Sequence, residues 1–125
     1  MSISALKDKF NSLTLESENH WDYRGNNNSE RDYVHGFCTY PAMMVPKMQR
    51  EMLEVCLEHL QDRSPLLLDP FAGSGTILVE AMLKGLNVVG IDINPLAILL
   101  CKAKTTILNR NLLQEKTDQL FNWVT

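Results

Sequence analysis

Two short segments of the chain carry the residues best suited to binding a ligand. The first is the turn Asp69-Pro-Phe-Ala-Gly-Ser-Gly-Thr76, in which Gly73 and Gly75 permit positive φ and leave no Cβ in the way of a bound group. Between a strand and a helix, such a turn presents backbone N–H donors suited to a phosphate or a carboxylate. The second is Asp92, a carboxylate that can accept hydrogen bonds from both hydroxyls of a ribose. Together they predict a site for a nucleoside-bearing cofactor.

The elements that must position these residues form one βαβ unit. Leu66-Leu67-Leu68 is typical of a strand buried on both faces, a helix is expected from Ile77 to Lys84, and Val88-Val89-Gly90-Ile91 is a second apolar run. Such a short crossover predicts parallel strands, whose carboxyl ends are where open α/β sheets bind ligands. The alternative is a purely structural turn, because glycine pairs and acids at strand ends also occur by chance.

Further helices are expected on both sides of this unit. Apolar spacing and the helix-starting residues Pro46 and Asn94-Pro95 predict them at residues 3 to 14, 46 to 60, 95 to about 108, and 112 to 123. Residues 16 to 34 are charged and asparagine-rich, which is typical of a loop. We therefore predict an α/β, partial Rossmann-like fold, divided into an N-terminal helix and polar loop (1–34) and a cofactor-binding half-domain (35–125).

The composition narrows the class of protein. With 45% apolar and 22% charged residues, no long apolar run and no signal-peptide pattern, the chain is expected to be a cytoplasmic protein without a membrane span. Cys38, Cys56 and Cys101 show no C-x-x-C spacing, which predicts neither disulfides nor a metal site. The net charge of −3 predicts weak binding of nucleic acid by this chain alone. The initiating Met favours a natural subunit over a truncated fragment.

The turn lacks the signatures of two common phosphate sites. Leu78 stands where a dinucleotide fingerprint has its third glycine, and no lysine follows the glycines as in a P-loop. Instead, the turn followed by Gly90-Ile-Asp-Ile-Asn-Pro95 resembles the cofactor motif and ribose-binding acid of the DNA methyltransferases that modify the exocyclic amino group of cytosine or adenine. His35-Gly-Phe-Cys-Thr-Tyr-Pro-Ala-Met-Met-Val-Pro46 is similar to the segment that precedes this turn in members with permuted motif order. The resemblance spans about residues 35 to 105.

The resemblance implies that the cofactor is S-adenosylmethionine. It implies that the turn lines the methionine moiety, that Asp92 binds the ribose and Ile93 the adenine, and that Asp69 approaches the ammonium group. The implied cofactor-binding residues are Tyr40, Pro41, Ala42, Asp69, Pro70, Phe71, Ala72, Gly73, Ser74, Gly75, Thr76, Asp92, Ile93 and Asn94. From the residues alone, the Tyr40 segment is a plain loop before a helix, Met43, Met44, Met48 and Met52 are core residues, and the role of His35 stays open.

The catalytic part expected of such an enzyme is missing from the sequence. The family holds its target base with a Pro-Pro-aromatic loop, and no Pro-Pro occurs in this chain. Two strands would also leave open sheet edges. We therefore expect one half of a split methyltransferase, inactive alone, whose partner polypeptide supplies the catalytic loop, the remaining strands and the DNA contacts, with a homodimer possible when that partner is absent. The alternatives are a non-catalytic remnant of the fold and part of an RNA methyltransferase.

Overall fold

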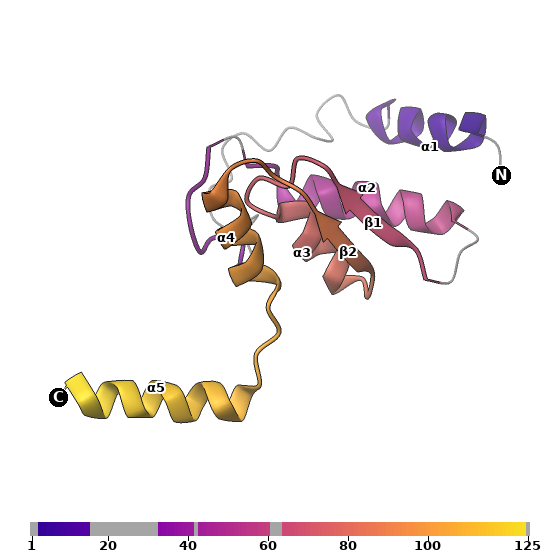
Figure 1. The fold of residues 1–125 in the computed structure, drawn as a ribbon. Helices are drawn as coiled ribbons and strands as arrows, with labels where there is room; N and C mark the ends of the chain where they lie inside the picture. Colours follow the sequence, from indigo (N-terminus) through magenta and orange to yellow (C-terminus); the bar gives the residue numbers. More distant parts are fainter. Residues whose placement is uncertain (1–2, 16–32, 42, 61–63, 125) are drawn as a thin grey trace.

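The computed structural model describes residues 3–15, 33–41, 43–60 and 64–124. The elements follow one another as α1 (Ile3–Leu15), α2 (Pro46–His59), β1 (Leu66–Asp69), α3 (Thr76–Leu83), β2 (Asn87–Gly90), α4 (Pro95–Thr105) and α5 (Arg110–Val124), as Figure 1 shows. The predicted α/β class and the βαβ unit are confirmed. Most of the loop predicted at residues 16 to 34 lies outside the described residues.

The two strands form a parallel sheet with one face covered by helix. Leu67 lies opposite Val88 in the register, and Asp69 lies opposite Gly90. Leu67 and Val88 pack toward the core around Leu78 of α3. A Cβ on Gly90 would lie 2.5 Å from Leu78 Cδ1, so glycine at this position lets α3 approach the sheet closely.

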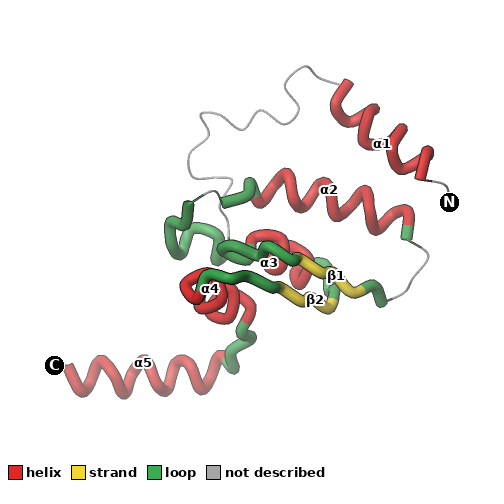
Figure 2. Tube along the Cα trace, turned by 45° about the horizontal axis from the view of Figure 1, so that its top comes forward, coloured by secondary structure: helices red, strands yellow, loops and turns green. Residues whose placement is uncertain are grey.

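The opposite face of the sheet corrects the prediction of a strand buried on both sides. Leu66 and Leu68 of β1 are 64% and 59% exposed, and Val89 and Ile91 are also exposed. In the view of Figure 2, α2 and α3 lie on one side of the strands. Parallel strands are normally covered on both faces, so this apolar face is a candidate contact surface.

The helix ends follow the local signals in the sequence. Pro46 stands in the first turn of α2, and Asn94 caps α4 because its Oδ1 accepts the Leu96 N–H at 3.0 Å. Helix α4 ends at Thr105, three residues before the predicted Leu108. Residues 105 to 107 are consecutive β-branched residues, which lower helix propensity.

The C-terminal helix α5 stands apart from the rest of the chain in Figures 1 and 2. None of its described residues is buried, and Phe121 and Trp123 are among its exposed side chains. Across the described residues, no helix combines the length and the apolar character needed to cross a membrane.

Candidate functional site

Two left-handed glycines shape the turn between β1 and α3. Gly73 has φ +49°, and Gly75 has φ +75° at the position that caps α3. A Cβ on Gly75 would lie 3.0 Å from Cys101 Sγ, so a side chain here would crowd the thiol. Burial and the nearby carboxylate of Asp92 raise the pKa of the Cys101 thiol. The protonated thiol donates to the carbonyl oxygen of Gly73 at 3.3 Å, so a side chain of α4 helps to hold the turn.

Asp92 lies beside this turn, as the parallel topology predicts. Its Oδ2 accepts the Gly73 N–H at 2.7 Å, and its Oδ1 accepts the Asn94 N–H at 2.8 Å. The N–H groups of Asn94 and then Gly73 lower the pKa of the Asp92 carboxyl, because both stabilise its charged form. Asp92 is therefore an ionised acceptor, and each of its oxygens keeps a further lone pair for a ligand hydroxyl.

The rim of donors expected at the turn is largely used by the protein itself. The Phe71 N–H donates to Asp69 Oδ1 at 3.0 Å, the Ala72 N–H to the Ile91 carbonyl at 2.9 Å, and the Gly75 N–H to the Ala72 carbonyl at 2.7 Å. With the Gly73 N–H bonded to Asp92, four donors of the turn fix its shape. The expectation that the N–H groups of the turn are free to bind a ligand is therefore wrong for these four. A glycine-rich turn also needs hydrogen bonds to keep its conformation.

The segment before α2 reaches across to the turn. Tyr40 Oη accepts a hydrogen bond from Asn94 Nδ2 at 2.9 Å. The Tyr40 ring also borders Gly73, since a Cβ there would lie 3.8 Å from Tyr40 Cε1. The structure thus brings together three segments that are far apart in the sequence. Pro41 is exposed beside Tyr40, and Ala42 lies outside the described residues.

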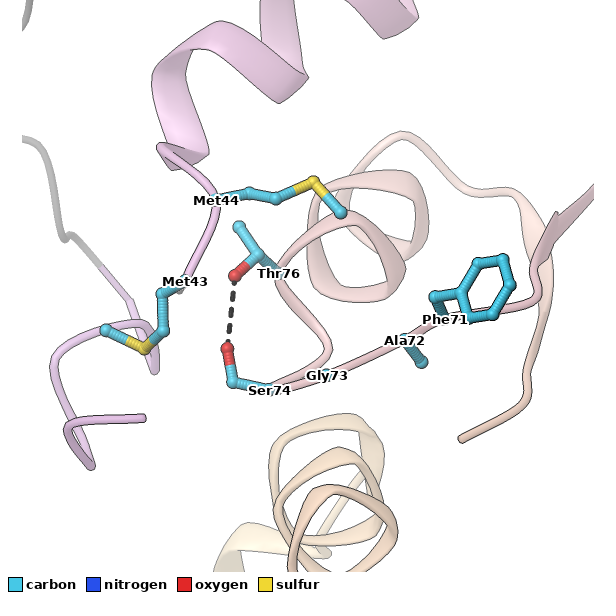
Figure 3. Close-up of a pocket in the computed structure, with 7 residues that line it drawn as sticks. All are labelled: Met43, Met44, Phe71, Ala72, Gly73, Ser74 and Thr76. Carbon is cyan, nitrogen blue, oxygen red and sulfur yellow. Dashed lines mark hydrogen bonds between the residues drawn. The ribbon is translucent and has the colours of Figure 1, made fainter. Parts of the chain in front are cut away.

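A small hollow of about 40 Å³ opens between this segment and the turn. In Figure 3, Met43 and Met44 lie across from Ser74 and Thr76, while Phe71 marks its other end. The expectation that Met44 is a core residue is wrong, because it is 39% exposed. Met43 is half-buried, and both methionines line the hollow. Ligand pockets usually enclose about 300–1,000 Å³, so the hollow is only part of a site for a whole cofactor.

The other predicted site residues divide into buried and exposed sets. Ala72, Ser74 and Thr76 are buried in the turn, whereas Phe71 and Ile93 are 82% and 100% exposed. Pro70 is also exposed. Asp69 is buried, and its Oδ2 receives no hydrogen bond from the described part of the chain. A buried carboxylate oxygen is costly without a donor, so this atom is suited to a donor supplied by a ligand.

A polar cluster that the sequence did not reveal lies around Glu80, one helical turn beyond Thr76 in α3. Glu80 of α3 is fully buried and contacts both His35 and Arg50. The sequence held one signal of this cluster. Glu80 stands between Val79 and Ala81 in an almost wholly apolar helix, and a buried acid requires partners.

The chain is similar in sequence to a family of DNA methylases and to several of its members. The family model for DNA methylase matches residues 5–102, which is most of the chain. The type II methyltransferase M.MvaI of Kocuria varians is 39% identical over 94 residues, covering 75% of this chain and 20% of that protein. M.MjaII of Methanocaldococcus jannaschii is 34% identical over 87 residues, covering 67% and 16%.

A second group of relatives is described as acting on RNA. The tRNA (guanine(10)-N2)-dimethyltransferase of Methanothermobacter thermautotrophicus is 47% identical over 55 residues, covering 44% of this chain and 16% of that protein. The chain thus spans a fifth or less of the length of these three relatives. No solved structure matches it significantly.

Proposed function

Since the chain belongs to the family of S-adenosylmethionine-dependent DNA methyltransferases that modify exocyclic amino groups, we propose that it is the cofactor-binding part of such an enzyme. The observation that carries the proposal is the meeting of Gly73, Asp92 and Tyr40 at the carboxyl ends of two parallel strands. That edge is where open α/β sheets bind nucleoside cofactors.

The residues at this edge fit the chemical groups of S-adenosylmethionine. The buried Asp69 Oδ2 suits the ammonium group, and the ionised Asp92 suits the ribose hydroxyls. Ile93 offers exposed apolar surface to the adenine, and Phe71 offers it beside the hollow. Met43 contributes a polarizable thioether to the same wall.

The bound cofactor would supply an electrophilic methyl group, and this chain would orient it. Asp92 would hold the ribose through two acceptors that the backbone already keeps in place. Tyr40 would border the same site, because Asn94 tethers its hydroxyl. Orientation of the donor is a large part of catalysis when two substrates must meet. The target base would be held by a Pro-Pro-aromatic loop, which this sequence lacks.

We propose that a second polypeptide carries that loop and packs on the bare face of the sheet. Leu66, Leu68, Val89 and Ile91 form an apolar surface there, whereas parallel sheets are normally covered on both faces. The chain spans at most a fifth of the M.MvaI and M.MjaII relatives, so a polypeptide corresponding to their remaining length is the expected occupant. The net charge of −3 fits DNA contacts made mainly by that partner.

Calorimetric titration with S-adenosylmethionine tests the cofactor proposal. The cofactor should bind the chain in complex with a partner that bears the Pro-Pro-aromatic loop, and Asp92→Ala should weaken that binding about tenfold or more. The absence of binding even in the complex would refute the proposal. Unchanged affinity in Asp92→Ala would remove this carboxylate from the site.

A second candidate is methylation of RNA, which the similarity to the tRNA dimethyltransferase favours. Transfer of a tritium-labelled methyl group to duplex DNA and to tRNA by the assembled complex separates the two functions. Incorporation into tRNA alone would replace the DNA proposal. Cofactor binding without transfer to either substrate would favour a non-catalytic role.

A further inference from the structure

The buried cluster around Glu80 joins three segments through one carboxylate. Glu80 Oε1 lies 2.8 Å from His35 Nε2 and accepts a hydrogen bond from Arg50 Nη2 at 3.0 Å. Glu80 Oε2 accepts the Arg50 Nε–H at 2.7 Å. Because an ionised carboxylate only accepts, His35 Nε2 carries the proton of the first contact. The two contacts of Arg50 form the bidentate fork that makes guanidinium pairing strong and directional.

The cluster fixes both ends of the segment that faces the glycine turn. His35 stands five residues before Tyr40, and Arg50 stands six residues after Met44. Both hold the same side chain of α3, and Glu80 lies one helical turn beyond Thr76, where α3 begins. Between these two anchors lie the tether of Tyr40 to Asn94 and the methionines that line the hollow. A segment closed at both ends has few conformations left to lose when a ligand binds.

We infer that His35, Glu80 and Arg50 act as a clamp that positions the Tyr40 segment over the cofactor site. The inference rests on the proposed function, because it assigns the clamp to binding of the same cofactor. None of the three side chains lines the hollow, so they are positioning residues rather than contacts of the ligand.

If the cluster only stabilised the fold, its loss would change cofactor affinity no more than the loss of another ion pair between α2 and α3. The chain offers a matched comparison in Glu54 of α2, which pairs with Lys84 at the end of α3. That pair is partly exposed, whereas the Glu80 side chain is 1% exposed. It also lies outside the segment of residues 35 to 45. Glu54→Gln therefore removes a helix-to-helix ion pair without touching the anchors of that segment.

The test compares His35→Ala, His35→Gln and Glu54→Gln in the full chain. Glutamine keeps an N–H donor near the place of His35 Nε2. The replacement of His35 by glutamine removes no other side-chain hydrogen bond, because His35 Nδ1 has no partner within the described residues. Affinity for S-adenosylmethionine is measured by calorimetry in the assembled complex. Hydrogen–deuterium exchange of residues 36 to 41 is measured in the free chain, and urea unfolding confirms that each variant is folded.

His35→Ala should speed exchange in residues 36 to 41 and weaken cofactor affinity about 3- to 30-fold, the range of long-range coupling. His35→Gln should restore most of both properties, and Glu54→Gln should change neither. The inference is overturned if His35→Ala leaves exchange in residues 36 to 41 unchanged, or if Glu54→Gln matches its effects. If His35→Ala does not fold, unchanged exchange and affinity in Arg50→Lys, which loses the bidentate fork, would overturn it.

Failure of the proposed function gives a different result. The wild-type complex would then bind no cofactor, while exchange in residues 36 to 41 would still respond to His35→Ala. The exchange measurement thus judges the clamp independently of the ligand.

Discussion

Replacement of Gly75 by alanine tests whether close packing of α4 against the turn shapes the site. Gly75 has φ +75°, and its added Cβ would lie 3.0 Å from Cys101 Sγ, 3.4 Å from Cys101 Cα and 3.6 Å from Cys101 Cβ. The separation from Sγ is shorter than most contacts of a Cβ, and the separation from Cα is at the limit of an ordinary contact. An added Cβ therefore requires the thiol to rotate or α4 to move by a few tenths of an ångström.

Two costs add in this substitution. A left-handed conformation costs a residue with a Cβ about 1–2 kcal/mol. Overpacking of a close contact costs a further ~1–3 kcal/mol. Reduced freedom of the unfolded chain returns about 0.4–1 kcal/mol. We therefore expect Gly75→Ala to lower the free energy of unfolding by about 1–5 kcal/mol.

Gly85→Ala is the matched control for the conformational cost. Gly85 has φ +78°, and an added Cβ there meets no atom within 4 Å. It should lose only about 1 kcal/mol. Urea unfolding followed by far-UV circular dichroism gives both values. If the two variants differ by less than about 0.5 kcal/mol, the contact with Cys101 contributes nothing and the packing argument fails.

Three further substitutions probe other parts of the same site. Gly90→Ala should lower the free energy of unfolding by about 1–3 kcal/mol in urea, because its Cβ would meet Leu78 Cδ1 at 2.5 Å, and an unchanged value would contradict the close approach of α3. The hydrogen bonds of Asp92 hold its pKa below the ordinary value of 3.8. Their contribution to stability is therefore fully present above pH 3.8 and is lost as the pH falls through the lowered pKa of the folded state. Asp92→Asn should therefore lose less stability than wild type when urea midpoints at pH 7 and pH 3 are compared, and an equal loss would contradict the role of the Gly73 N–H. Phe71→Ala should leave the urea midpoint unchanged because the ring is 82% exposed, yet it should weaken cofactor binding in calorimetry.

The βαβ unit, its family and the meeting of the turn with Asp92 could all be predicted from the sequence, because each depends on local signals. Short apolar runs mark the strands, and glycines mark the turn between β1 and α3. The match of residues 5–102 to the DNA methylase family confirms the resemblance seen in the motifs. The roles of the individual site residues stay predictions.

Features that depend on distant partners could not be predicted in the same way. Glu80 bonds to residues 30 and 45 positions away, and nothing in the spacing of His35 and Arg50 indicates that they meet. The run of three leucines at β1 predicted burial on both faces, but burial depends on what covers the strand. Leu66 and Leu68 are exposed here because the described residues cover only the face toward α3.

From the hydrogen bonds of the turn we predict that the proposed cofactor binding does not depend on assembly with the proposed partner. Four N–H groups of the turn are bonded within the chain, and Cys101 and Asp92 hold Gly73 from two sides. A site held in this way needs little ordering when a ligand arrives, which lowers the cost of binding. The apolar surface left exposed lies on the other face of the sheet, around Leu68. We therefore expect the proposed partner to cover that surface and supply the catalytic loop, whereas hydrogen bonds within this chain set the conformation of the turn.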